Sequence, residues 1–190
     1  MEPRLKEAKE GKRVVYFIDA AHFVLAPFLG ILWTLERIFI KAPTGRQRYN
    51  VLGALDAITH ELITVTNETY INALSIVTLL EEIAQRKNND IPITIILDNA
   101  PYQKCKVVFE KAKELGIELL YLPAYSPNLN IIERLWKFVK KDCLYSKYYE
   151  NFKLFKKAIL SCLKQTQTAH KKELDSLLTL KFQVFNNQLL

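Results

Sequence analysis

The sequence predicts an α/β protein with a mixed sheet flanked by helices, and three features carry that prediction. Residues 13 to 19, 49 to 55 and 61 to 66 form short β-rich runs in close succession, as in an antiparallel meander. A later run, residues 91 to 98, is apolar on both faces, which is typical of a central strand covered by helices. Between the runs, apolar residues recur at the spacing of amphipathic helices.

The elements around the central strand follow in order. Apolar residues at helical spacing predict a helix over residues 71 to 86, which the turn-forming run NNDIP ends. After the central strand, a second helix is predicted over residues 103 to 115 and is stopped by Gly116. The run IELLYL, residues 117 to 122, then predicts a further strand of the sheet.

A third helix should follow the loop PAYSPNLN. Ser126 and Pro127 predict its start, because a serine oxygen can cap free amides and proline suits the first helical position. Its apolar stripe places Glu133 near the edge of the core. The stripe consists of Ile132, Leu135, Trp136, Val139 and Cys143. Another amphipathic helix is expected over residues 152 to 163, and residues 173 to 190 are leucine-rich.

Composition bounds the class of protein. The chain has 190 residues, of which 49% are hydrophobic, enough for one domain with a sizeable core. A net charge of +7 favours a polyanionic partner such as nucleic acid, although an ordinary basic soluble protein has the same balance. Three widely spaced cysteines predict free thiols in a reducing compartment and no zinc site. The charged N-terminus and the interrupted apolar stretch FVLAPFLGILW predict neither a signal peptide nor a membrane span.

Three acidic residues form the candidate site. Asp19 and Asp98 stand at the ends of apolar runs, where the edge of an α/β sheet presents ligands and catalytic groups. Buried carboxylates are costly unless they are paired or bind a metal, so these two and Glu133 should share a cation. All-oxygen ligands favour Mg²⁺ or Mn²⁺ over zinc. Taken singly, each acid also has an ordinary structural explanation. Asp19 could cap a strand end, Asp98 could open a turn, and Glu133 could favour a helix N-terminus through the helix dipole.

The order and spacing of these acids match a known pattern. The blocks are FIDAAHF around Asp19, ILDNAPYQ around Asp98 and, after 34 intervening residues, LPAYSPNLNIIERLWKFVKK around Glu133. Over residues 13 to 145 the chain thereby resembles the catalytic domain of the mariner-like superfamily of DDE transposases, especially bacterial insertion-sequence members. The third block is the specific one, whereas the first alone would be weak evidence.

The resemblance implies a ribonuclease H-like fold with a mixed five-stranded sheet. It implies a DNA transposase that cleaves strands at transposon ends and transfers them, using two Mg²⁺ or Mn²⁺ ions. On this pattern Asp19 bridges both ions, Asp98 completes one site and Glu133 the other. Hydrolysis would free a 3′-hydroxyl that then attacks target DNA. One departure concerns Ala20, where many relatives carry an acidic residue, so the details of metal coordination are open.

Four neighbours are candidates for supporting roles, and each also has an ordinary structural explanation. His22 would support the metal site or contact DNA, and Asn130, one turn before Glu133, would orient that acid. Asn99 and Tyr102 follow Asp98 and would touch the substrate, although turn chemistry explains Asn99 equally well.

Basic residues near the third acid are candidates for DNA contacts. Residues 133 to 157 contain eight Lys or Arg and three Asp or Glu, so basic side chains could meet phosphates beside the scissile bond. A solvated helix face is the alternative, and we prefer it for Lys153 to Lys157. The predicted DNA-binding residues are Arg134, Lys137, Lys140 and Lys141, with a second basic spot at Arg46 and Arg48.

The predicted organisation is an N-terminal extension (1–12), a catalytic domain (13–145) and a C-terminal helical extension (146–190). Expected partners are double-stranded DNA, both terminal inverted repeats and target, and a second copy in a homodimer. Nothing before residue 13 could form the helix-turn-helix module with which relatives recognise transposon ends, so we expect a catalytic domain alone. A cytoplasmic, nucleoid-associated protein of a prokaryote is expected, without membrane contact.

Of three alternatives to the transposase, two remain. A structure-specific nuclease or resolvase of the same fold would share the acids and metals but never join strands. A phosphatase with an aspartyl nucleophile is discounted, because Ala21 stands where a second aspartate is needed. A non-catalytic DNA-binding or dimerisation remnant, with the leucine-rich tail packed on a partner, is the alternative from another class.

Overall fold

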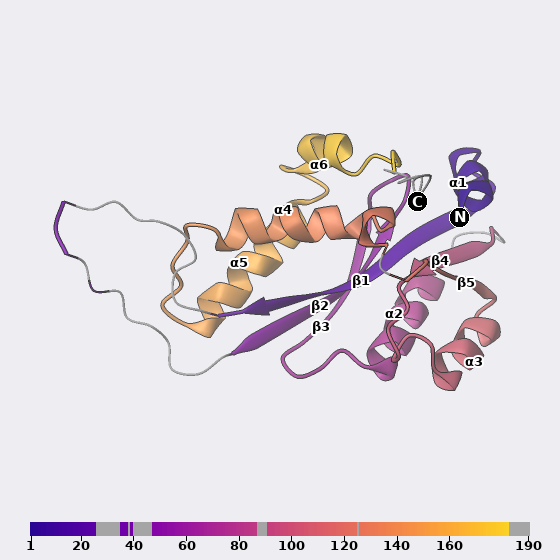
Figure 1. Ribbon diagram of the computed structural model, residues 1–190, viewed down its shortest axis with the longest axis horizontal. Coiled ribbons are helices and arrows are strands. Elements are labelled where there is room, and N and C mark those ends of the chain that lie inside the picture. Colours follow the sequence, from indigo (N-terminus) through magenta and orange to yellow (C-terminus); the bar gives the residue numbers. More distant parts are fainter. Residues whose placement is uncertain (26–34, 38, 40–46, 87–90, 125, 183–190) are drawn as a thin grey trace, which may run out of the picture.

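A five-stranded mixed sheet forms the centre of the computed structural model, which describes residues 1–25, 35–37, 39, 47–86, 91–124 and 126–182 (Figure 1). The strand order is β3-β2-β1-β4-β5. The first three strands form the predicted antiparallel meander, and the last two run parallel to β1. The strands are β1 (Val14–Val24), β2 (Arg48–Asp56), β3 (Leu62–Asn67), β4 (Ile93–Leu97) and β5 (Ile117–Tyr121).

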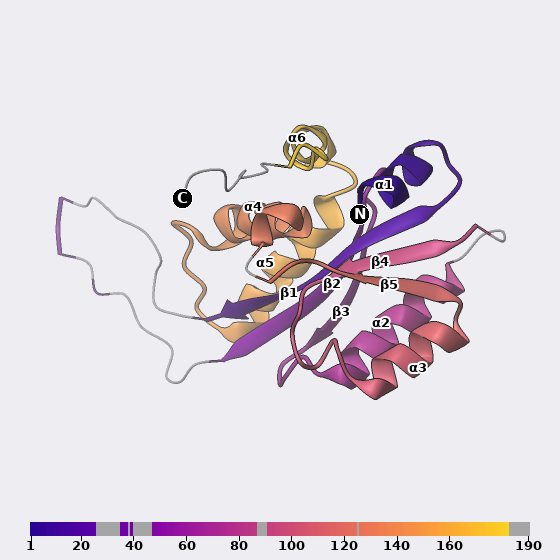
Figure 2. The same cartoon turned by 45° about the vertical axis from the view of Figure 1, so that its right-hand side comes forward.

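Helices cover both faces of the sheet. Figures 1 and 2 show α2 and α3 against one face, α4 and α5 against the other, and α6 outside α4. No helix among the described residues is long and apolar enough to cross a membrane. The helices are α1 (Glu2–Lys9), α2 (Ala73–Gln85), α3 (Lys106–Glu114), the short 3₁₀ helix η1 (Pro127–Leu129), α4 (Ile132–Leu144), α5 (Phe152–Gln165) and α6 (Lys171–Leu177).

Two apolar clusters, one on each face, form the core. Alternate residues of a strand point to opposite faces, so Phe17 packs with the α4 and α5 side, whereas Ile18 packs with α2 and α3. The fully buried run of β4 contributes to both clusters through Ile95 and Ile96. The prediction of a central strand covered by helices is confirmed.

The predicted end of the first strand is wrong. β1 continues five residues past Asp19 to Val24, because β2 pairs with it along that whole length, up to the pair Val24 and Arg48. On its other edge β1 pairs with β4 only as far as Phe17 and Ile96. Asp19 therefore lies inside a strand, just beyond the point where the parallel neighbour ends.

The predicted start of the third helix is also wrong. The segment after Ser126 forms the 3₁₀ turn η1, and α4 begins only at Ile132, with no side-chain cap. The Ser126 hydroxyl donates to the Ala124 carbonyl instead, at 3.4 Å. Between the turn and the helix, Asn130 is buried and donates to the Ile18 carbonyl, which holds the chain against the sheet. The predicted apolar stripe of this helix is buried as expected.

Candidate active site

The three predicted acids meet at one edge of the sheet. Asp19 comes from the interior of β1, Asp98 directly follows β4, and Glu133 lies in the first turn of α4. One carboxylate oxygen from each lies within 4.8 Å of the others. Residues at least 35 positions apart in the sequence are thus brought to a single point.

A close approach between β2 and α4 sets the position of Glu133. Gly53 of β2 is the register partner of Asp19 in β1. The side chain of Trp136, one turn after Glu133 on α4, packs directly over Gly53. A Cβ atom at position 53 would lie 2.7 Å from the Trp136 ring, closer than packed atoms can come. The missing side chain therefore lets α4 lie directly on the sheet beside Asp19.

Burial and like charge dominate the electrostatics of the site. Burial, followed by the charges of Glu133 and Asp98, raises the pKa of Asp19 from 3.8 to about 7. The Ala20 backbone N–H and the charge of Lys140 oppose this rise only in part. Burial also raises the pKa of Asp98, against a hydrogen bond from Asn130. Negative charge is thus gathered where water stabilises it poorly.

Asn130 connects two of the strands to the start of α4. Its amide nitrogen lies 3.3 Å from the Ile18 carbonyl and 3.5 Å from Asp98 Oδ1, so it reaches Asp98 rather than Glu133. Its side-chain oxygen is buried and has no hydrogen-bond partner among the described residues. The amide nitrogen of Asn130 thus faces the acidic site, whereas its side-chain oxygen is a buried polar atom still to be satisfied.

These side chains fit a hard divalent cation. The three acids offer only oxygen ligands, which Mg²⁺ and Mn²⁺ prefer. A cation would also remove the repulsion that raises the pKa of Asp19. The three acids could therefore hold a divalent metal.

The other candidate supporting residues take different places. His22 lies on the opposite face of β1 from Asp19, with Nδ1 2.7 Å from Asn50 Oδ1, so the structure does not bring it to the acids. The Asn99 amide donates to the Leu122 carbonyl and ties the end of β4 to the end of β5. Burial, followed by the charges of Asp19 and Asp98, raises the pKa of Tyr102, so this hydroxyl lies within the electrostatic reach of the two acids.

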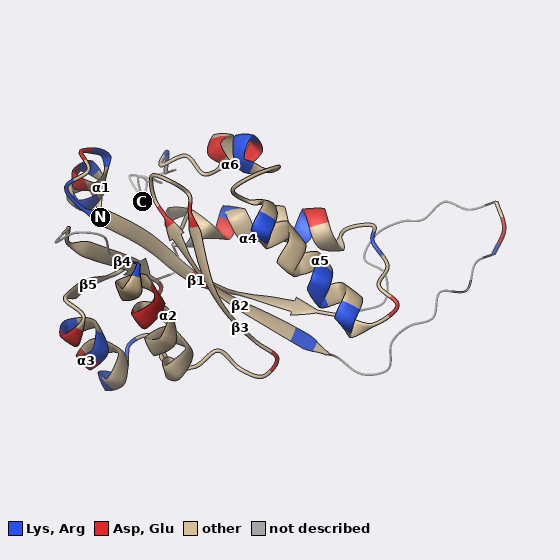
Figure 3. Cartoon of the chain, turned by 180° about the vertical axis from the view of Figure 1, so that it is seen from behind, with Lys and Arg blue, Asp and Glu red and all other residues tan. Residues whose placement is uncertain are grey.

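The basic candidates separate into two groups. Lys137, Lys140 and Lys141 are exposed on α4, and Arg48 is exposed at the start of β2 (Figure 3). The Arg134 guanidinium instead donates to three backbone carbonyls of the C-terminal segment. These are the carbonyls of Leu177, Thr179 and Lys181, at 3.3, 2.7 and 3.0 Å. Arg46 lies outside the described residues.

A cavity of about 500 Å³ opens beside Glu133 and is lined by Lys137 on the same helix. Asn128 and Lys181 also line it, and sequence reasoning missed both. Lys181 follows α6, far along the chain, and no local pattern distinguishes it from other lysines. The cavity places two lysines on the same side of α4 as one of the acids.

A family model described as DDE superfamily endonuclease matches residues 14–156, a range that contains all three acids. The chain belongs to the DDE superfamily of endonucleases. The predicted resemblance is thereby confirmed, and the acids that carried it are the ones that converge in the structure.

Known proteins similar to this DDE endonuclease agree with that assignment. The insertion element IS630 uncharacterized 39 kDa protein of Shigella sonnei is 29% identical over 126 residues. That match covers 65% of this chain but only 36% of the relative, so this chain spans about a third of its length.

Solved structures show the same fold. A pre-cleavage Mos1 transpososome matches with a TM-score of 0.59 and 12% identity, covering 97% of this chain and 61% of that chain. The catalytic core of HTLV-2 integrase, in complex with magnesium, matches with a TM-score of 0.54 and 13% identity. It covers 81% of this chain and 86% of that one. The predicted ribonuclease H-like fold is confirmed.

Proposed function

We propose that this DDE endonuclease is the catalytic domain of a metal-dependent DNA transposase, which cleaves strands at transposon ends and joins them to target DNA. The convergence of Asp19, Asp98 and Glu133 within 4.8 Å is the observation that carries the proposal. The similarity to an insertion-element protein and to the Mos1 transpososome supports the choice of a transposase.

The three acids would hold two ions, Mg²⁺ or Mn²⁺, with Asp19 between them. When bound, such a pair lowers the pKa of an attacking water or 3′-hydroxyl and offsets charge on the leaving oxygen. The HTLV-2 integrase core, similar in fold, is a complex with magnesium. The raised pKa of Asp19 supports a cation at this point, because the charges of Glu133 and Asp98 add to burial in raising it, and the charge of Lys140 offsets them only in part.

The surrounding residues would position the acids and the substrate. Asn130 contacts Asp98 and the strand that carries Asp19, so it would keep the two carboxylates in register. Lys137 and Lys140 project from α4 near Glu133 and Asp19, where they would contact phosphates next to the scissile bond. Arg134 would act indirectly, by holding the C-terminal segment against α4.

Partners follow from this reaction. Double-stranded DNA would enter both as transposon end and as target, and a homodimer would hold two ends together. We propose that a helix-turn-helix module outside these 190 residues recognises the inverted repeats. Residues 13 to 145 would form the catalytic unit and residues 146 to 190 its helical extension.

A strand-transfer assay tests the proposal. A labelled duplex with a free 3′-hydroxyl is incubated with supercoiled plasmid and Mn²⁺ or Mg²⁺, and both nicking and joining are measured. Asp98→Asn and Glu133→Gln should each lower both activities at least about 100-fold, because losing a metal ligand costs more than losing its supporting contact. Glu150→Gln, which removes an exposed acid outside the site, is the matched control.

The other possible results of this assay would each contradict part of the proposal. Metal-dependent nicking without joining would identify a nuclease or resolvase. DNA binding without nicking, in folded wild-type protein, would identify a non-catalytic remnant. Nicking that both acid variants retain would refute the assignment of the site.

A further inference from the structure

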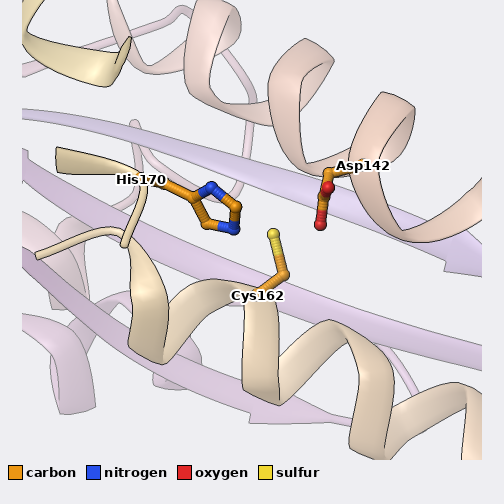
Figure 4. A group of neighbouring side chains, drawn as sticks. All are labelled: Asp142, Cys162 and His170. Atoms are coloured by element: carbon orange, nitrogen blue, oxygen red, sulfur yellow. The ribbon is translucent and has the colours of Figure 1, made fainter. Parts of the chain in front are cut away.

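A second group of metal-ligating side chains lies at the other end of α4 (Figure 4). Asp142 comes from α4, Cys162 from α5, and His170 directly precedes α6. Ligand atoms of the three lie within 4.8 Å of one another, and in Figure 4 the side chains converge from three helical elements. Asp142 stands nine residues after Glu133 on one helix, about 13 Å along its axis, so this group is separate from the acidic site.

The histidine carries the second observation. His170 Nε2 is buried and has no hydrogen-bond partner among the described residues. Its ring packs edge-on against Phe138, with centroids 5.1 Å apart, which fixes the ring orientation. A buried ring nitrogen without a partner is costly in a folded protein, and a metal ion is one group that satisfies it.

We propose that Asp142, Cys162 and His170 bind a zinc ion that fastens α4, α5 and α6 together. Sulfur, imidazole nitrogen and carboxylate oxygen together are a zinc donor set, whereas Mg²⁺ and Ca²⁺ take oxygen ligands. Tetrahedral zinc with bonds of about 2.0 to 2.3 Å holds its ligand atoms about 3.5 Å apart. The ligand atoms here lie within 4.8 Å of one another, so small side-chain rotations that move them by about 1 Å would complete the site. Cys162 is 3% exposed, which shields the thiolate from solvent.

The fourth ligand would reach the ion from an adjoining cavity. This cavity has a volume of about 260 Å³, borders Asp142 and His170, and admits either water or the carboxylate of Glu173, which also lines it. Lys141 and Lys147 line the same cavity and oppose a cation, but two carboxylates and a thiolate outweigh them. Burial raises the pKa of the Cys162 thiol to about 12, so zinc must displace the thiol proton, as it does on binding other cysteines.

The position gives the ion a structural role. Arg134 already holds residues 177 to 181 against the first half of α4 through three carbonyls. A zinc ion at Asp142 would fasten α5 and the start of α6 to the second half of α4. The prediction of no zinc site rested on the spacing of cysteine pairs, and this cluster uses a single cysteine whose partners lie 20 and 8 residues away.

Cobalt titration of the full metal-free chain tests the proposal. Co²⁺ occupies zinc sites, and a bound thiolate gives a charge-transfer absorption that the carboxylates of Asp19, Asp98 and Glu133 do not produce. We expect this band to saturate at one equivalent and to disappear when Zn²⁺ is added. Cys162→Ser should abolish it, and His170→Gln should weaken Co²⁺ binding at least about 100-fold. Cys105→Ser and Asp98→Asn, which alter another cysteine and the acidic site, should keep it.

A stability readout keeps the test decisive if Cys162→Ser folds poorly. With the acidic site disabled, Zn²⁺ should raise the Tm of Asp98→Asn but not of the double variant Asp98→Asn/His170→Gln. Absence of the thiolate band in wild type would overturn the proposal. A band that His170→Gln retains at full affinity, or that Cys105→Ser loses, would also overturn it, because the ion would then sit elsewhere.

Discussion

Replacing Asp19 with asparagine should stabilise the metal-free protein above neutral pH. Burial and neighbouring charge raise the pKa of this carboxyl from 3.8 to about 7. Between these two values the folded protein keeps a proton that the unfolded chain has released. The unfolded state therefore binds fewer protons than the folded state, and the stability of wild type falls as pH rises through this window. Asparagine cannot ionise and escapes this loss.

The pKa difference sets the size of the effect. A gap of about 3 pH units, at about 1.4 kcal/mol per unit, amounts to about 4 kcal/mol once the pH exceeds the folded pKa. Asp19→Asn and wild type should thus differ little near pH 4, because both side chains are then neutral. The variant should be more stable by up to about 4 kcal/mol at pH 8.

Urea unfolding in the presence of EDTA, at pH 5, 6, 7 and 8, measures the difference in free energy of unfolding between Asp19→Asn and wild type. Asp175→Asn is the matched control, because a hydrogen bond from His60 lowers the pKa of that exposed carboxyl and no stabilisation should grow with pH. Excess Mn²⁺ in place of EDTA should stabilise the wild type more than the variant, and so reduce this difference in free energy of unfolding. A stability advantage of Asp19→Asn over wild type that, in EDTA, stays constant or decreases between pH 5 and 8 would refute the reasoning.

Three further predictions concern packing and charge. Gly53→Ala should destabilise the fold by about 1 to 3 kcal/mol in urea unfolding, and Trp136→Phe in the same chain should recover part of that loss by making room. Arg134→Ala should speed amide exchange at residues 177 to 182 about tenfold or more, with the sheet unchanged, because three hydrogen bonds to carbonyls are lost. Lys137→Gln should reduce the slope of log DNA affinity against log salt by about 1, whereas Lys153→Gln, on the outer face of α5, should leave it unchanged.

Local patterns predicted most elements of this fold, because burial on a strand or helix repeats with a fixed period. The stripe of α4 and the doubly apolar β4 are examples, and both are buried as predicted. The two errors arose where distant residues decide. β1 extends past Asp19 because β2 pairs with it, and α4 starts late because Asn130 is held by the Ile18 carbonyl. Neither partner is visible within a short window of sequence.

The acids themselves were identifiable from sequence, but the reason they converge was not. Gly53 faces Asp19 across the pair of strands and admits Trp136, so one contact sets both the depth of α4 and the distance from Glu133 to Asp19. Burial and the charge of Glu133 are also the two largest causes of the raised pKa. The same contact thus destabilises the metal-free protein and assembles its ligands. A side chain at position 53 should therefore lower the pKa of Asp19 and weaken Mn²⁺ binding together, whereas independent origins would let one change without the other.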